Sequence, residues 1–221
     1  MPSKAQPARY AGTYTDRHGG EAIVFENDGE TLRTRIRGIE FSDRDFDGLA
    51  AETAVPETFT LAWGCLCACT FTAVVPVPLV TPGREVSANL EIRVELGEAR
   101  DSPRGGISYE WVFASLSYDG RRFDSSGKSG WFEDELLEIQ KALPDGIYIK
   151  ACINCLYSDY GVAGHGSFGD MICFRTCKQE YLAVRSKQDY MAMEPPGANK
   201  VQEIHLCPDF ARRIPGTGYR G

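Results

Sequence analysis

The chain has 221 residues, a formal net charge of −7 and 43% hydrophobic residues. This hydrophobic share is ordinary for a globular protein and excludes a disordered chain. The acidic balance argues against nucleic-acid binding, which normally needs a basic surplus, and against docking on anionic lipid. The 23 glycines and 12 prolines predict many turns and short strands.

The first 129 residues are expected to form antiparallel strands joined by tight turns. Alternation of apolar and polar residues predicts strands at residues 10–15, 21–25, 31–36, 90–96, 107–118 and 121–123. Asn27-Asp28-Gly29 and Asp119-Gly120 supply residues that tolerate positive φ, so each is expected to close a hairpin. Residues 42–54 are acidic and irregular, and we expect a loop there.

Residues 61–80 carry no charge over a length that would span a membrane. Pro76 and Pro78 interrupt this segment and its second half is β-branched, which favours a strand buried on both faces over a membrane helix. Three cysteines alternate along the segment and are expected to point the same way as core residues: Cys65, Cys67 and Cys69.

The N-terminus has one early lysine without the roughly 7–15 apolar residues that a secretory signal needs, so we expect a cytoplasmic protein. Eight cysteines in a reducing compartment are expected to be thiols, metal ligands or nucleophiles instead of four disulfides. Their spacing therefore carries functional information.

The clearest helix is predicted at residues 131–143. Ser129 is a candidate N-cap, three acidic residues fall in the first turn, and Pro144 ends the helix. An apolar stripe at helical spacing is expected to pack on the sheet: Phe132, Leu136, Ile139 and Leu143. Short strands are expected at residues 147–151, 171–175, 181–185 and 201–206, and a second helix, capped by Ser186, at 187–193.

These elements predict an α+β fold that is mainly β. We expect an antiparallel β-sandwich or a strongly curved sheet, with one covering helix and a Cys-rich C-terminal part. The sheet part takes residues 1–129 and the helix with the Cys-rich part takes residues 130–221. The helix is expected to pack across the join, so that the two parts can form one continuous domain.

The best candidate for a functional site is a set of paired cysteines. Two residues separate Cys152 from Cys155, three separate Cys173 from Cys177, and 17 lie between the pairs. Two close pairs with such a gap are typical of a zinc site. Four thiolates close the coordination sphere and leave no position for water, so the predicted Zn²⁺ is structural. A set of buried reduced thiols is the alternative.

The identity of the fourth ligand is open. The three-residue spacing of Cys173 and Cys177 departs from the commonest pattern. Cys207 is a rival, and His165 or His205 also has the chemistry to coordinate zinc.

A catalytic interpretation centres on the glycine-rich stretch between Tyr157 and Gly169. It would make the chain a hydrolase or transferase with His165 as acid and base and a Cys or Ser nucleophile. The residues that such a set would use are Cys155, Ser158, Asp159 and His165.

Several motifs of the last third occur together: LPDGIYIKACINC at residues 143–155, SDY at 158–160, GHG at 164–166, CFR at 173–175 and PGTGYRG at the end. With this combination the chain resembles an uncharacterised, mostly actinobacterial family of similar-sized proteins known only as a domain of unknown function. The resemblance is dense from Trp131 onward and implies no activity. It implies that the shared cysteines are Cys152, Cys155, Cys173 and Cys207, with Cys177 less regular, which favours Cys207 as the fourth ligand.

The sequence therefore predicts a zinc-stabilised protein-interaction module. Its acidic surface suits a basic protein partner, for example a toxin that it neutralises, because complementary charge speeds encounter. The alternative is the hydrolase or transferase described above. We expect no nucleic-acid partner and no membrane association.

Overall fold

The computed structural model describes residues 8–101, 105–161, 168–169, 171–193 and 200–219. Its main feature is a nine-stranded sheet in which every pairing is antiparallel. The strand order is β10-β9-β8-β7-β1-β2-β3-β4, and β11 pairs with the end of β7. The prediction of a mainly β fold is confirmed.

The strands of the large sheet are β1 (Ala8–Asp16), β2 (Gly19–Asn27), β3 (Leu32–Ile36), β4 (Ile39–Asp43), β7 (Cys69–Thr81), β8 (Arg84–Leu96), β9 (Glu110–Tyr118), β10 (Arg121–Asp124) and β11 (Tyr148–Ile149). Two strands form a small hairpin, β5 (Leu61–Ala62) and β6 (Cys65–Leu66). Three more form a separate sheet, β12 (Ser158–Tyr160), β13 (Met171–Cys173) and β14 (Lys200–Val201). The helices are α1 (Phe132–Ala142), α2 (Lys178–Ala183) and α3 (Lys187–Met193), with a 3₁₀ turn η1 (Cys152–Asn154).

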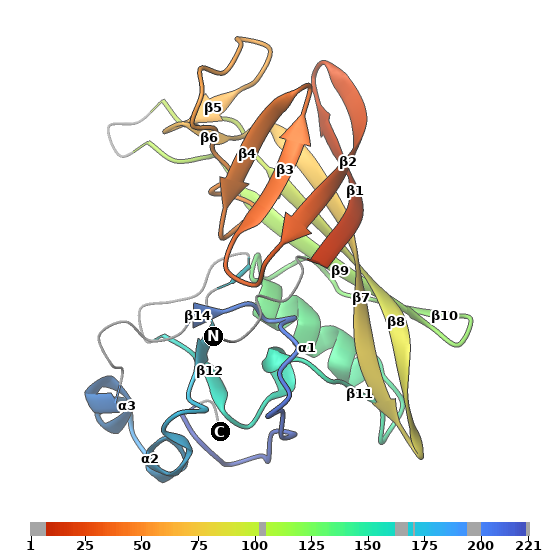
Figure 1. Cartoon of the computed structure of the whole chain (residues 1–221), viewed down its shortest axis with the longest axis vertical. Coiled ribbons are helices and arrows are strands. Elements are labelled where there is room, and N and C mark those ends of the chain that lie inside the picture. Colours follow the sequence, from red (N-terminus) through yellow and green to blue (C-terminus); the bar gives the residue numbers. More distant parts are fainter. Residues whose placement is uncertain (1–7, 102–104, 162–167, 170, 194–199, 220–221) are drawn as a thin grey trace, which may run out of the picture.

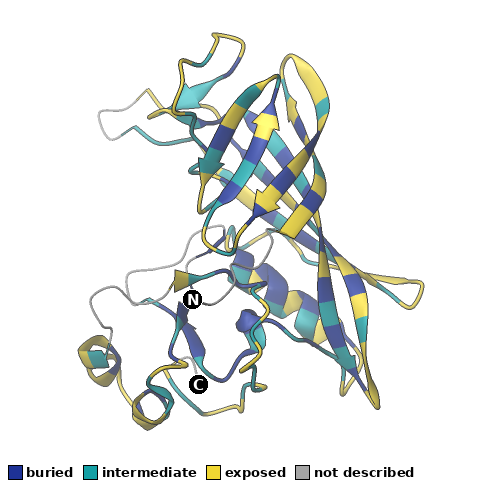
Figure 2. Cartoon of the chain, viewed as in Figure 1, coloured by how far each residue is buried: buried dark blue, intermediate teal, exposed yellow. Residues whose placement is uncertain are grey.

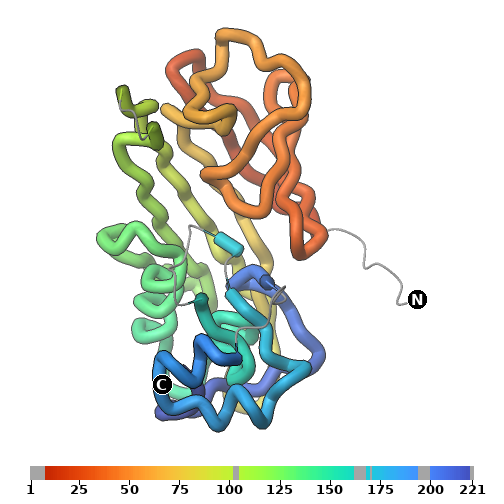
Figure 3. The backbone as a smooth tube through the Cα atoms, turned by 90° about the vertical axis from the view of Figure 1, so that its left-hand side faces the viewer, coloured from red at the N-terminus to blue at the C-terminus, as the bar shows by residue number. Residues whose placement is uncertain are grey.

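The large sheet curves, so that β1–β4 lie across from β7–β9 (Figure 1; Figure 3 shows the same halves after a 90° turn). Buried aromatic rings fill the space between the halves, with Phe25 at 5.3 Å from Phe46 and 6.0 Å from Phe71 between centroids. Along the strands of Figure 2, buried and exposed residues alternate, which shows one face toward the core and one toward solvent. Of the two predicted alternatives, the structure has the curved sheet.

The core continues into the C-terminal part of the chain. Phe168 packs against Phe46 at 5.4 Å and against Phe132 of α1 at 5.7 Å between ring centroids. One cluster of buried apolar residues runs from Tyr10 to Ile204. The described part of residues 130–219 therefore packs against the sheet through shared core contacts.

Residues 61–80 do not form the single strand that was expected. A tight turn at Trp63 and Gly64, both with positive φ, pairs β5 with β6, and Ala68, with φ +52°, separates β6 from β7. The outward side chains of β7 are also not buried, since Val74 is 39% exposed. The prediction of a strand buried on both faces is wrong, because the alternate side chains of β7 that point away from the core stay partly or largely exposed.

The two prolines of β7 occupy a gap between its partners. β1 pairs with β7 only as far as Val74, and β11 begins to pair at Leu79. Pro76 and Pro78 lie between these points, where neither β1 nor β11 pairs with β7. The N–H group that proline lacks therefore breaks no ladder on this side of the strand.

Helix α1 confirms its predicted stripe, and all four apolar residues of the stripe are buried: Phe132, Leu136, Ile139 and Leu143. Its predicted cap is wrong, because the N-cap residue is Trp131 without a side-chain cap. The Ser129 hydroxyl instead donates to the buried Glu135 carboxylate at 2.7 Å. Burial alone would raise the pKa of Glu135. Hydrogen bonds from Ser125, Ser129 and the Gly127 N–H outweigh this effect, so the pKa lies below its usual value.

Two other expectations for the C-terminal part are wrong. Residues 178–183 form helix α2 where a strand was expected, because Tyr181 and Val184, three residues apart, turn together into a small core with Phe174. The strand expected at 201–206 is reduced to β14. Helix α3 is confirmed together with its cap, since the Asp189 N–H donates to the Ser186 hydroxyl at 3.1 Å. Within the described residues, no helix has the length and apolar character that a membrane crossing needs.

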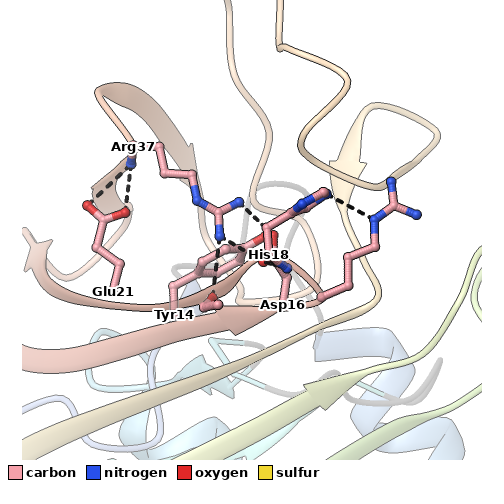
Figure 4. A network of polar contacts seen from close by, with 7 residues as sticks. Tyr14, Asp16, His18, Glu21 and Arg37 are labelled. Carbon is pink, nitrogen blue, oxygen red and sulfur yellow. Dashed lines mark hydrogen bonds and ion pairs between the residues drawn. The ribbon is translucent and has the colours of Figure 1, made fainter.

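A partly buried ion pair joins the β1–β2 turn to the β3–β4 turn (Figure 4). Both terminal nitrogens of Arg37 donate to the Asp16 carboxylate at 2.7 Å. The Tyr14 hydroxyl and the His18 N–H donate to the same carboxylate at 2.9 and 2.8 Å. The guanidinium also lies 5.4 Å from the Tyr14 ring centroid and 5.3 Å from that of Phe59. This one contact therefore satisfies a nearly buried carboxylate and covers two core rings.

Arg37 takes an unusual backbone conformation to make this contact. Its φ is +47°, and Gly38 follows at +83°, which is the turn that links β3 to β4. Its N–H donates to the Glu21 carboxylate at 3.0 Å. A strained arginine at a hairpin tip is thus held by two carboxylates from the neighbouring hairpin.

We predict that Asp16→Asn lowers the free energy of unfolding by about 2 kcal/mol at pH 7, because hydrogen bonding from Arg37 lowers the pKa of Asp16 from 3.8 to about 2. Since the folded-state pKa is the lower one, this contribution is complete above about pH 4 and is lost as the pH falls toward 2. Urea unfolding of both proteins between pH 7 and 2 measures the difference. Glu40→Gln, at an exposed pair with Arg35, is the control and is expected to change little. A difference for Asp16 that stays constant down to pH 2 would contradict the prediction.

Candidate functional site

The first cysteine pair lies on the turn η1, which helix α1 holds in place. The Cys155 N–H donates to the Cys152 carbonyl at 3.0 Å, so the chain folds back and both thiols are buried. Between them, the Asn154 side chain donates to Gln140 of α1 and to the Ile149 carbonyl, each at 2.9 Å. A covering helix therefore positions the predicted metal-binding turn.

The second predicted pair is divided between two environments. Cys173 ends β13, where it lies opposite Ser158 in the ladder with β12 and thus close to the turn of the first pair. Cys177 precedes helix α2 and packs against the small core that contains Phe174 and Tyr181.

A third segment brings Cys207 to the first pair. The Cys152 N–H donates to the His205 carbonyl at 3.1 Å, and the Leu156 N–H donates to the Ala211 carbonyl at 2.7 Å. Cys155 also forms a bridge with Arg212. Cys207 lies on the stretch of chain between these attachment points.

Cys155, Cys173 and Cys207 all act on the pKa of the buried Cys152 thiol. Burial is the main reason why the pKa of Cys152 is raised, and Cys155, Cys173, Cys207 and Glu203 raise it further in that order. Burial also raises the pKa of Cys173, and Cys207 and Cys155 add to this effect. As placed in the part of the chain that the structure describes, no three His, Cys, Asp or Glu side chains are close enough together to hold a metal ion.

Two buried carboxylates beside the cysteines are fully engaged in hydrogen bonds. Glu203 accepts from the Tyr160 hydroxyl at 2.9 Å and from the Gly169 N–H at 2.7 Å. Asp159 accepts from the Tyr181 hydroxyl at 2.7 Å and from the Tyr160 N–H at 2.8 Å. Burial and the Asp159 charge raise the pKa of Tyr181 to about 12. These contacts fix β12 against α2 and the C-terminal segment.

Two residues of the catalytic interpretation, Ser158 and Asp159, use their side chains in hydrogen bonds within the fold. The Ser158 hydroxyl is buried and donates to the carbonyls of Cys152 and Cys155. His165 and its neighbouring glycines lie outside the described residues. His205 is half-buried, and burial followed by the charge of Arg175 lowers its pKa.

The earlier cysteine cluster belongs to the break in the uncharged segment. Cys67 and Cys69 are buried and Cys65 is half-buried, on either side of the positive-φ residue Ala68. Burial raises the pKa of each of these three thiols. Cys67 and Cys69 are thus buried as predicted, whereas Cys65 is only half-buried, and the break removes the regular alternation that was expected.

The family model that matches residues 8–158 describes a family of unknown function. The chain belongs to this family, DUF6304. The match covers the large sheet, helix α1 and the first cysteine pair, whereas Cys173 and Cys207 follow its end. No curated protein and no solved structure matches the chain significantly.

A second feature that the sequence did not single out is the outer face of β8 and β9. Tyr109 and Trp111 are 42% and 47% exposed, and their rings stack at 4.5 Å. Phe113 continues the row, with the Arg93 guanidinium 4.1 Å from its ring centroid, and Arg93 pairs with Glu95 at 2.8 Å. The alternation of these aromatic residues was visible in the sequence, but only the sheet order shows that they face solvent.

This face also carries a depression of about 260 Å³ between β8, β9 and β10. Arg122 pairs with Glu91 at 3.0 Å and with Asp124 at 2.7 Å along its wall. Aromatic and arginine side chains held in place by carboxylates are the residue types that dominate the energy of protein interfaces.

A reciprocal amide pair attaches the cysteine segment to the sheet. Asn27, at the end of β2, donates to Gln202 at 2.6 Å, and Gln202 donates back at 3.0 Å. Both side chains are buried. The position of residues 202–207 relative to the sheet depends on this contact.

We predict that Gln202→Leu lowers the free energy of unfolding by about 1–3 kcal/mol, because it removes two hydrogen bonds of the buried Asn27 amide and leaves only those with Tyr10 and Gly29. The double variant Asn27→Leu/Gln202→Leu is expected to cost less than the sum of the single variants. Chemical denaturation of the three variants gives the coupling energy. Gln188→Leu, at an exposed position of α3, is the control. Strictly additive losses would show that the pair does not join the two segments.

Proposed function

We propose that the chain is a protein-interaction module of the reducing cytoplasm, stabilised by a structural Zn²⁺ bound to Cys152, Cys155, Cys173 and Cys207. What supports the metal site is that these four thiols lie on three segments joined by backbone hydrogen bonds, and that, in addition to burial, Cys155, Cys173 and Cys207 all raise the pKa of Cys152. All eight cysteines, each within a described segment, are free thiols, as a reducing compartment requires.

A zinc ion would remove the electrostatic conflict among these thiols. Without metal, burial and the neighbouring sulfurs disfavour the thiolate of Cys152. A divalent cation stabilises coordinated thiolates, so metal binding converts mutual repulsion into attraction and releases protons. A set of four thiolates leaves no open position for water, and this supports a structural role over a catalytic one.

The surroundings of the two rival ligands favour Cys207 over Cys177. Cys207 raises the pKa of both Cys152 and Cys173, whereas Cys177 is not among the groups that shift either pKa. Cys177 instead packs beside the aromatic core of α2.

The outer face of β8 and β9 supports the interaction role. Stacked exposed Tyr109 and Trp111 provide rigid contact area at low entropic cost, and the charged side chains around them provide orientation. The net charge of −7 suits a partner with a basic surface. A basic toxin that this chain neutralises is one partner of that class. Because Ser158 and Asp159 already use their polar atoms in internal hydrogen bonds, these contacts favour binding over the hydrolase or transferase alternative.

We predict about one zinc ion per chain, with four thiols protected until a chelator is added. Elemental analysis by ICP-MS of protein purified without a metal-affinity column, together with a thiol count, measures both. Cys207→Ser should lose most of the zinc, and Cys177→Ser should keep it. Zinc-free wild-type protein with reactive thiols would overturn the metal site, and loss of zinc from Cys177→Ser alone would exchange the fourth ligand.

We predict that the double variant Tyr109→Ser/Trp111→Ser binds the partner at least about tenfold more weakly, because it removes two exposed aromatic anchors. The partner is first recovered by co-purification from the native host and its affinity is then measured with purified components. Val24→Ser/Val74→Ser is the matched control, since these exposed valines lie on β2 and β7 of the same sheet. Recovery of no stoichiometric partner, or equal binding by both variants, would count against this surface.

A further inference from the structure

The hairpin of β5 and β6 ends in a turn whose residues do not match its geometry. Ala62 pairs with Cys65, and the two residues between them, Trp63 and Gly64, have φ of +53° and +87°. A two-residue hairpin loop with positive φ at both positions favours Asn-Gly, because asparagine tolerates the left-handed region better than bulky residues do. Tryptophan at the first position therefore costs free energy that asparagine would not.

Trp63 is also the most exposed large apolar side chain in the part of the chain that the structure describes, at 78%. Its indole lies so close to the backbone of Gly105 that a Cβ added there would clash with the ring. This contact positions the ring and leaves most of it in solvent. Neither the turn nor burial accounts for a tryptophan here, and residues that break such local rules are expected at functional positions.

Backbone hydrogen bonds hold the hairpin against its neighbours. The Leu66 N–H donates to the Leu49 carbonyl at 2.9 Å. The Cys67 N–H donates to the Thr60 carbonyl at 3.0 Å. Trp63 is thus presented on a fixed element, which lowers the entropy that binding has to remove.

The segment around the hairpin is strongly acidic. Residues 40–66 contain six carboxylates and one arginine, and so hold five of the seven net negative charges of the chain. Burial raises the pKa of Cys65, and the charges of Asp43 and Asp47 raise it further, so the negative potential extends to the hairpin. All of the carboxylates except Asp45 are exposed: Glu40, Asp43, Asp47, Glu52 and Glu57.

The hairpin lies far from the proposed zinc site. In Figure 1, β5 and β6 are at the end of the molecule opposite α2 and the C-terminus, and Figure 3 shows the same separation after a 90° turn. The acidic segment is therefore a surface separate from the cysteine-rich part.

We propose that Trp63 and the acidic segment 40–66 form a docking surface for a basic protein, in which the indole enters an apolar pocket rimmed by lysine and arginine. This inference rests on the proposed interaction role and names the part of the chain that meets the partner's basic surface. Tryptophan is enriched among the residues that dominate binding energy, and the carboxylates around it speed encounter with positive charge. The same carboxylates disfavour anionic lipid, and membrane surfaces are the other environment in which exposed indoles are common.

Trp63→Asn separates binding from folding. Because asparagine suits the turn, we expect the free energy of unfolding in urea to be unchanged or higher. Affinity for the partner protein, co-purified from the native host and then isolated, is expected to fall at least about tenfold. Met191→Ser removes an exposed apolar side chain of α3 and is the control that should keep its affinity.

The double variant Glu52→Gln/Glu57→Gln tests the charge. We expect association with the isolated partner to slow roughly threefold at low salt. The difference should disappear at about 1 M salt, where the screening length is about 3 Å. Glu30→Gln/Glu180→Gln removes the same charge at exposed positions outside the segment and is expected to associate at close to the wild-type rate.

The outcomes distinguish this inference from the proposed function. Recovery of no partner would overturn both. A partner that binds Trp63→Asn as tightly as the wild type would overturn the docking surface and leave the interaction role standing. A lower unfolding free energy for Trp63→Asn would give the tryptophan a structural role and overturn the inference. Binding of the wild type, but not of Trp63→Asn, to phosphatidylcholine vesicles would replace the protein partner with a membrane.

Discussion

Gln202 and Glu203 are neighbours in the chain, and their buried side chains bond to different parts of the molecule. Gln202 exchanges two hydrogen bonds with Asn27 of the large sheet, whereas Glu203 accepts from Tyr160 and Gly169 in the C-terminal part. The backbone of the same segment accepts from η1, since the Ile153 and Cys152 N–H groups donate to the carbonyls of residues 203 and 205. Because buried polar groups are costly unless they are paired, the segment has one favourable position, and the proposed ligands take their places from it.

Local signals predicted the parts of the fold whose chemistry is local. Asp119 and Gly120 both have positive φ in a tight hairpin, and these residue types tolerate that conformation. The stripe of α1 and the Ser186 cap of α3 were also correct, because each depends on residues within a few positions of one another. When hairpins of this kind follow one another along the chain, each strand pairs antiparallel with the next, and an antiparallel sheet results.

The errors arise where a distant contact decides the local structure. Residues 61–80 are continuous in composition, yet positive φ at Trp63 and Ala68 breaks the strand. The Ala68 N–H donates to the carbonyl of Gly97, which directly follows β8. Residues 181–185 alternate enough to suggest a strand, but packing of Tyr181 on Phe174, with ring centroids 4.5 Å apart, turns them into a helix. Tyr109 and Trp111 alternate like core residues, and their exposure follows only from the sheet order.

The candidate site shows the same limit. Spacing identified the thiols, but Cys152 and Cys207 are 55 residues apart, and the contacts of residues 202–205 that bring them together follow no spacing rule. Cys177 and Cys207 are therefore equal by spacing, and only the position of α2 gives them different surroundings. Since the same segment attaches these cysteines to Asn27, an ion bound at the thiols would stabilise the join between the C-terminal part and the sheet by linkage. Trp111 lies on β9, which the large core holds, and Tyr109 directly precedes this strand, so the proposed metal site and the proposed partner surface lie on different parts of the structure.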